Sequence, residues 1–122
     1  MQPDDAVLLD ILIAARRARS FTEGLDFAGF ARDAKTQAAV LYELAVIGEA
    51  VRRLSEAFLN KHATIPWHEI ASMRNRLLHE YHRVELETVW RVVEDDLPPL
   101  LAYLSPLVPP ETPGPGSAAR GA

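Results

Sequence analysis

Apolar residues recur at every third or fourth position along most of the chain, which is the spacing of helices that bury one face. The first such stretch predicts a helix over about residues 4–19, with acidic residues at its start and arginines near its end, as the helix dipole favours. Its repeating apolar residues are Val7, Leu8, Ile11, Leu12 and Ala15. We expect this helix to lie against a hydrophobic core.

A second, longer stretch predicts a helix that is capped by Asp26 or Asp33 and ends near Phe58. Its apolar stripe has the spacing of a helix packed in a bundle and consists of Leu44, Ile47, Val51, Leu54 and Phe58. Gly48 lies within this helix, where glycine is less favourable than alanine by up to ~1 kcal/mol. We expect another helix to approach closely at this position.

Two further helices are predicted in the second half of the chain. One starts at Pro66, a residue that suits the first turn of a helix, and a turn follows it over residues 81–84. The other begins near Glu85 and is kinked or broken at Pro98 and Pro99, because proline removes a backbone donor.

The fold class follows from these periods. No stretch shows the alternation of a strand, so we predict an all-α protein, an up-and-down bundle of four to five helices. Residues 1–104 form one domain, in which residues 100–104 make a last short helix. Residues 105–122 form a disordered Pro/Gly-rich tail without a functional signal, and five of the nine prolines lie between positions 106 and 115.

Composition and charge narrow the classes of function. The chain has no cysteine, which excludes disulfides and cysteine-based zinc sites and fits a cytoplasmic protein. The apolar run from Val7 to Ala15 is interrupted by Asp10 and is shorter than the ~20 residues of a membrane span, and the N-terminal residues are acidic, unlike a secretory signal. A net charge of −4 argues against broad binding along nucleic acid, but it is compatible with a small basic pocket.

The chemistry of the chain is concentrated between Met73 and Arg83. This segment holds three arginines, an asparagine, two histidines and a tyrosine. His79 has a side chain that takes and gives protons near neutral pH, and Arg74 carries a permanent charge on a fork that matches phosphate oxygens. Together they are a sufficient set for metal-free RNA cleavage, because the ribose 2′-hydroxyl is a nucleophile within the substrate and the cation stabilises charge on the phosphate.

The spacing of these residues restricts the geometry of a site. Asn75 and His79 are four apart and share a helix face, so the amide is placed to orient the imidazole. Arg74 and His79 are five apart, about 140° round an ideal helix. They converge only from the flanks of a cleft or through a distorted helix end, which favours a site between helices or between two subunits.

Other interpretations of the segment remain open. Arginine and histidine near a helix C-terminus also stabilise the helix dipole without any catalytic role. A metal site on His79 and His82 has no third ligand in the sequence, and His79 to His82 is one residue short of the His-Glu-x-x-His motif. We therefore expect no metal and no cofactor. Residues 94–96 (Glu-Asp-Asp) are expected to be a solvated helix end rather than a catalytic acid pair.

The pattern Arg74-Asn75-x3-His79-x-Tyr81 resembles the Arg-x4-His-x-Tyr signature of HEPN-domain toxins of the HepT type. The resemblance covers about residues 5–104. Further segments resemble the same family in the same order, namely Ile47-Gly48-Glu49-Ala50, Ile65 to Ile70, Met73 to Arg76, and Val89-Trp90 through Asp96-Leu97-Pro98.

The resemblance implies an all-α HEPN bundle that works as a homodimer, with the two motifs facing each other across a cleft. It implies a metal-independent endoribonuclease that acts as the toxin of a toxin–antitoxin pair. The partner that the resemblance implies is an antitoxin of the MntA type, a nucleotidyltransferase that transfers AMP to the motif tyrosine. In this sequence Arg74 and His79 are then catalytic, Asn75 supports them, and Tyr81 is the AMPylated residue.

Three basic residues of the segment are candidate RNA contacts around the cleft, namely Arg76, His82 and Arg83. Two alternatives differ from the toxin hypothesis. In one, the chain is a catalytically silent HEPN module that binds a nucleotidyltransferase. In the other, it is a helical interaction domain in which the motif is a coincidence.

Overall fold

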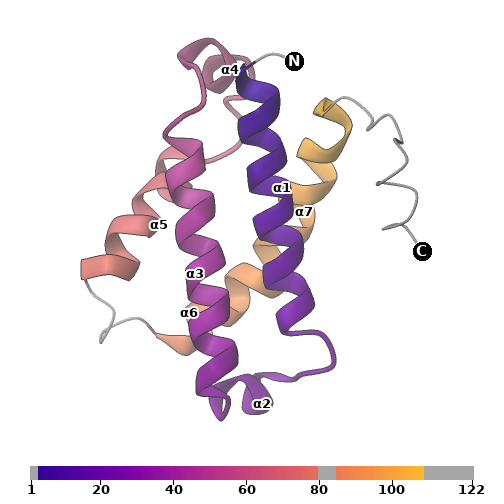
Figure 1. Cartoon of the computed structure of the whole chain (residues 1–122), viewed down its shortest axis with the longest axis vertical. Coiled ribbons are helices and arrows are strands. Elements are labelled where there is room, and N and C mark those ends of the chain that lie inside the picture. The colour runs from indigo at the N-terminus through magenta and orange to yellow at the C-terminus, as the bar shows by residue number, and fades with distance from the viewer. Residues whose placement is uncertain (1–2, 80–84, 109–122) are drawn as a thin grey trace, which may run out of the picture.

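The computed structural model describes residues 3–79 and 85–108, and in this part of the chain helices joined by loops are the regular elements, without strands (Figure 1). The predicted all-α fold class is therefore confirmed. The elements are α1 (Pro3–Phe21), α2 (Phe27–Ala31), α3 (Ala34–Val51), α4 (Glu56–Lys61), α5 (Trp67–His79), α6 (Leu86–Arg91), the π-helical segment η2 (Val92–Asp96), α7 (Leu97–Leu104) and the 3₁₀ turn η3 (Ser105–Leu107).

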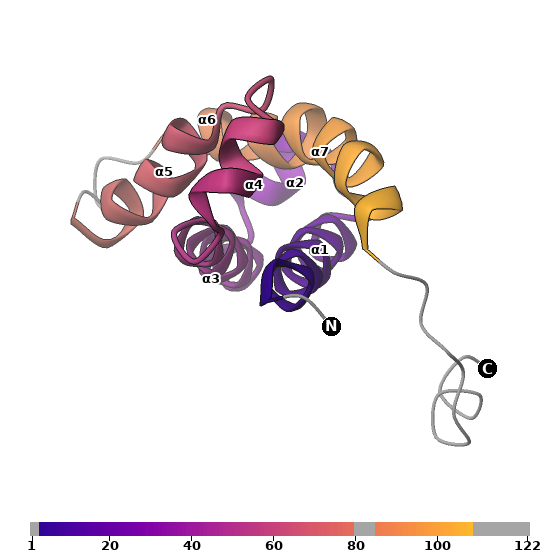
Figure 2. The same ribbon diagram turned by 90° about the horizontal axis from the view of Figure 1, so that it is seen from above.

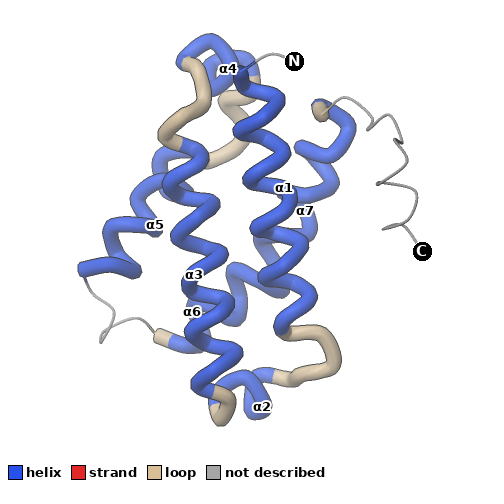
Figure 3. Tube along the Cα trace, in the orientation of Figure 1, coloured by secondary structure: helices blue, strands red, loops and turns tan. Residues whose placement is uncertain are grey.

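The long helices form two layers. α1 and α3 run side by side in opposite directions, and Figure 2 shows α5 and α7 on the same side of this pair. α4 covers one end of the bundle and α2 the other (Figure 3). The core between the layers contains large side chains that are fully buried, including Leu8, Ile11, Leu12, Phe30, Leu44, Val93 and Leu104.

The predicted long second helix is wrong in its extent, because the chain makes three helices there. Asp26 and Asp33 are both caps: Asp26 accepts from the N–H of Gly29 at 2.8 Å and begins α2, and Asp33 begins α3. α3 ends at Val51. Ser55 then caps α4, so the apolar stripe toward Phe58 continues in a separate helix.

The cap on α3 has a consequence for acid stability. Asp33 accepts hydrogen bonds from the side chain and the backbone N–H of Thr36, at 2.7 and 3.0 Å. The hydroxyl of Thr36 is the largest cause that holds the pKa of Asp33 below its ordinary value. Since the folded protein favours the charged carboxylate, this contribution to stability is present above the unfolded-state pKa and is lost as the pH falls through the folded-state pKa.

An ion pair joins α1 to a buried carboxylate on α3. Arg17 Nε lies 3.2 Å from Glu43 Oε2, and the Glu43 side chain is only 4% exposed whereas that of Arg17 is 60% exposed. Burial removes water from a charged carboxylate, which costs free energy of hydration. A nearby cation offsets this cost. The pair therefore helps to hold the two central helices in register.

We predict that Arg17→Ala lowers the free energy of unfolding by about 2 kcal/mol, less than for a fully buried pair because water screens Arg17. Urea unfolding followed by circular dichroism measures this change. Arg16→Ala removes an equally charged, exposed neighbour and should stay within about 0.5 kcal/mol of the wild type. A loss of the same size in Arg16→Ala, or no loss in Arg17→Ala, contradicts the role given to the pair.

Of the predicted kink or break at the two prolines, the break does not occur and the kink stays a prediction, because the helix that begins at Leu86 continues past them. It widens into the π segment η2 before them, and Pro98 and Pro99 occupy the first turn of α7, where missing N–H groups are tolerated. The N–H of Leu97 donates to the carbonyl of Val92, five residues back. The wider turn relieves the clash between a proline ring and the carbonyl four residues earlier. We call the continuous stretch Leu86–Leu104 the C-terminal rod.

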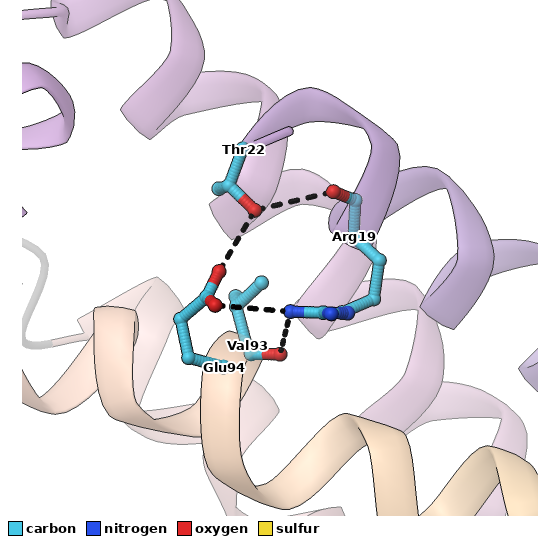
Figure 4. Close-up of polar contacts among 4 residues, drawn as sticks. All are labelled: Arg19, Thr22, Val93 and Glu94. Atoms are coloured by element: carbon cyan, nitrogen blue, oxygen red, sulfur yellow. Dashed lines mark hydrogen bonds and ion pairs between the residues drawn. The ribbon is translucent and has the colours of Figure 1, made fainter. Parts of the chain in front are cut away.

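Arg19 of α1 and Thr22, which directly follows this helix, stabilise the wider turn (Figure 4). In a π register the Val93 carbonyl would accept from residue 98, which as a proline has no N–H, and Arg19 donates to it instead at 3.3 Å. Arg19 also pairs with Glu94 at 3.2 Å. The buried Thr22 hydroxyl lies 3.3 Å from Glu94 Oε1 and 3.2 Å from the Arg19 carbonyl, so it can donate to either.

The acidic residues of η2 therefore differ from the expected solvated helix end. Asp95 and Asp96 are exposed, but Glu94 is half-buried and forms an ion pair with Arg19 of α1. All three residues lie within the continuous rod rather than at a helix end. Leu107 and Val108 pack against the core after α7. The predicted disordered tail lies outside the described residues from position 109 onward, and the domain boundary at 104 stays a prediction. No described helix has both the length and the apolar character that crossing a membrane requires.

Candidate functional site

The helix that carries the motif, α5, is fixed at its start and packs on α3. The indole N–H of Trp67 donates to the carbonyl of His62 at 3.0 Å, and its ring lies against Phe58 with centroids 5.9 Å apart. The N–H of Ile70 bonds to the carbonyl of Pro66 at 3.1 Å, which makes Pro66 the residue that leads into the helix, as predicted. The segment before α5 thus sets the direction in which the motif is presented.

The predicted catalytic positions share one helix. α5 is α-helical from Trp67 to His79, so positions 74 and 79 lie on the same helix, about 140° apart around its axis. The side chains of Arg74 and His79 lie outside the described residues. Their catalytic roles therefore stay predictions, and the helical backbone agrees with the expectation that a second surface completes the site.

The other candidate residues divide into two groups. Asn75 and Arg76 are exposed on α5. Tyr81, His82 and Arg83 lie outside the described residues, so their predicted roles are untested. Arg76 lines a groove between α5 and the helices that follow it, and Asn75 does not.

A groove of about 560 Å³ separates α5 from the C-terminal rod, and we call it the α5–rod groove. α3 forms its apolar floor through Leu44 and Ile47. Its walls and ends include Ile65, Pro66, Glu69, Ile70, Met73 and Arg76 on one side and Thr88, Arg91, Val92, Asp95, Asp96, Leu97, Pro99, Leu100 and Tyr103 on the other. The groove runs along α5 toward the end that carries the motif.

The charges in the groove are unevenly distributed. Arg76 from α5 and Arg91 from α6 line the part nearest residues 79 and 85, the two ends of the undescribed segment. Three carboxylates line the part of the groove that is further from the motif, namely those of Glu69, Asp95 and Asp96. The result is a basic end next to the motif and an acidic stretch beyond it.

Arg91 is a groove residue that was not predicted from the sequence. Its only signal was its place on the polar side of the helix that follows the motif. The residue of that helix that faces Arg76 is determined by the position of α6 relative to α5 and by the wider turn of η2. The apolar period reveals neither of these. Within residues 3–79 and 85–108, no cluster of three potential metal ligands lies close together. The structure describes neither the side chain of His79 nor residue His82, so the site weighed on these two histidines remains untested.

A helical bundle that carries the Arg-x4-His motif is the architecture that the resemblance implies for a HEPN domain. The family model described as Ribonuclease HepT-like matches residues 11–107. The chain belongs to the Ribonuclease HepT-like family. The predictions of this family and of a ribonuclease are thereby confirmed.

Several curated proteins are similar over most of their own length. "Probable ribonuclease HepT" of Thermococcus cleftensis is 40% identical over 93 residues, which cover 76% of this chain and 84% of that protein. "Putative RNase MJ0127" of Methanocaldococcus jannaschii is 41% identical over 93 residues, 76% of this chain and 77% of that protein. "Putative RNase TTE0752" of Caldanaerobacter subterraneus is 38% identical over 78 residues, 64% and 70% of the two chains. No solved structure matches the chain.

Proposed function

We propose that this protein is a metal-independent endoribonuclease and the toxin of a toxin–antitoxin pair, with Arg74 and His79 as its catalytic residues. The observation that carries the proposal is the Arg74-Asn75-x3-His79 sequence at the end of α5 in a chain of the Ribonuclease HepT-like family. The names of the relatives, which refer to ribonucleases, support the same substrate class.

The proposed reaction needs no group beyond protein side chains and the RNA. A His79 imidazole removes the proton of a ribose 2′-hydroxyl, and the 2′-oxygen attacks the adjacent phosphorus. The bond from phosphorus to the 5′-oxygen breaks, and that oxygen takes a proton from an imidazolium. Arg74 stabilises the negative charge that grows on the phosphate oxygens. The products are a 2′,3′-cyclic phosphate and a 5′-hydroxyl.

The active form is proposed to be a homodimer. Positions 74 and 79 lie about 140° apart on one helix, so a surface of a second subunit would let both groups reach one phosphate. In such a cleft the base and the acid are supplied by the His79 residues of the two chains. Asn75, four residues before His79 on α5, is placed to orient the imidazole.

The proposed control of this activity is AMPylation of Tyr81 by a nucleotidyltransferase antitoxin of the MntA type. Tyr81 follows His79 by two residues. An AMP group there would add bulk and negative charge where the RNA phosphate binds, so occlusion and like-charge repulsion both oppose cleavage.

Two measurements test the proposal. The purified protein in EDTA should cleave single-stranded RNA to 2′,3′-cyclic phosphate ends and leave the same sequence in DNA intact, because DNA lacks the nucleophile. Cleavage of DNA, or loss of RNA cleavage when metals are chelated, contradicts the mechanism. Light scattering at micromolar concentration should give the mass of a dimer, and a monomer there rules out the shared cleft.

A further inference from the structure

We propose that the α5–rod groove is the RNA subsite next to the scissile phosphate: Arg76 and Arg91 bind a backbone phosphate, and one unpaired base enters the apolar part of the groove. This inference rests on the proposed ribonuclease function and specifies its substrate as single-stranded RNA. It assigns to Arg91, a residue outside the motif, the role of a substrate contact.

The two arginines are exposed and have no ion-pair partner among residues 3–79 and 85–108. Elsewhere in the bundle Arg17, Arg19 and Arg53 each pair with a carboxylate. Two guanidinium groups that line one groove from opposite walls suit a phosphate, whose oxygens accept hydrogen bonds from both forks.

The basic end of the groove is close to the proposed catalytic position. Arg76 precedes His79 by three residues on α5, which is less than one helical turn. A phosphate held by Arg76 would therefore belong to a nucleotide near the one that is cleaved. The position of the groove along α5 thus supports a substrate path that continues from the motif.

The carboxylates further along the groove decide which part of the RNA enters. Glu69, Asp95 and Asp96 repel phosphates, so the backbone is confined to the end with the two arginines. The apolar side chains between them, including Met73 and Val92, favour an uncharged planar group. A volume of about 560 Å³ is in the range of small-ligand sites and accommodates a base with its ribose.

These features favour an unpaired strand over a duplex. A base in a helix is stacked and paired, and it reaches a side pocket only when it is splayed out, which costs least in single strands and loops. An amphipathic segment of a protein is the competing occupant of an apolar groove. The arginine pair beside the motif favours RNA, and the experiment below separates the two occupants.

The test measures RNA binding in a His79→Ala background, which blocks cleavage. Fluorescence anisotropy follows a labelled single strand and the same sequence as a duplex over a range of salt concentrations. We expect the single strand to bind at least about tenfold more tightly than the duplex. Arg76→Gln and Arg91→Gln should each weaken single-strand binding on the order of tenfold and lower the salt slope by about 0.7, the value for one lost phosphate contact.

Arg52→Gln is the matched control, because Arg52 is an exposed arginine at the C-terminal end of α3 that does not line the groove. It should leave affinity and slope unchanged. Thr88→Phe fills the groove without changing its charge, and it should weaken single-strand binding while preserving the salt slope. Circular dichroism verifies that each variant keeps its helix content.

The outcomes distinguish this inference from the function on which it rests. If the wild type cleaves RNA but Arg91→Gln binds like Arg52→Gln, the groove is not the subsite and the proposed function stands. If duplex and single strand bind equally, the base pocket is wrong. If Arg91→Gln binds RNA normally but fails to dimerise, the groove is a protein interface. If the wild type neither binds nor cleaves any RNA, the proposed function itself fails.

Discussion

Replacing His79 by alanine is expected to reduce RNA cleavage by about 10²- to 10⁴-fold, the range for loss of a general acid–base group. The imidazole is proposed to move the proton of the 2′-hydroxyl, and alanine has no group that replaces it. The measurement is the initial rate of cleavage of a labelled RNA in EDTA by wild type and variant. Binding of the RNA should change far less than the rate, because the phosphate is held by arginines.

His68→Ala provides the matched control for this experiment. His68 is an exposed histidine on the same helix, one residue after its start and outside the motif. Its replacement should leave the rate within about twofold of the wild type, since surface changes of this kind perturb stability by less than ~0.5 kcal/mol. Equal rates for wild type and His79→Ala would show that His79 does not act in proton transfer.

The second large effect concerns Tyr81. With ATP and a nucleotidyltransferase of the MntA type, the wild type should gain AMP, as detected by intact-mass spectrometry, and Tyr81→Phe should not. The modified protein should lose most of its RNA cleavage, because the added phosphate repels that of the substrate. Phenylalanine keeps the ring and removes only the hydroxyl that accepts the AMP.

The two other tyrosines of the chain make this test specific. Tyr42 is 66% exposed and Tyr103 is 41% exposed, so both are accessible to an enzyme in solution. Tyr42→Phe and Tyr103→Phe should therefore be AMPylated like the wild type. AMP found on either residue, or a Tyr81→Phe variant that is still modified, would refute the assignment of the modification site.

Much of the fold could be predicted from the apolar period, because that period reports which helix face is buried. The predicted start of α1 and the use of aspartate caps agree with the structure, since caps depend on local hydrogen bonds. The end of α3 at Val51 could not be predicted from the stripe alone. The apolar spacing continues to Phe58, and the break depends on Ser55, whose side chain caps α4 and whose hydroxyl also contacts Asp4 of α1 at 2.6 Å.

The π segment of the C-terminal rod could not be predicted from the apolar spacing. Val89, Val93 and Leu97 are buried and each is four residues from the next. On an ideal α-helix two such steps drift by about 80°, whereas a wider turn keeps them on one face. The apolar stripe of an ordinary α-helix is itself about 100° wide, so this spacing fits both kinds of turn and did not indicate the π segment.

The candidate site was predictable only in part. Residue types and spacing single out Arg74 and His79, because their chemistry depends on what they are. The opposite wall of the groove could not be predicted from the local sequence. Arg91 lines the groove only because of the way in which α5 and the rod pack together. This is why Arg76 was a candidate contact from the sequence and Arg91 was not.

The π segment has the geometry of an α-helix into which a single residue has been inserted. Deletion of one residue between Val92 and Asp96 would restore an ordinary helix and turn everything before it by about 100° relative to α7. Arg91 would then leave the groove while the core contacts of Leu97 and Leu104 stayed in place. The length of this segment therefore helps to determine whether the bundle carries a second arginine beside its motif.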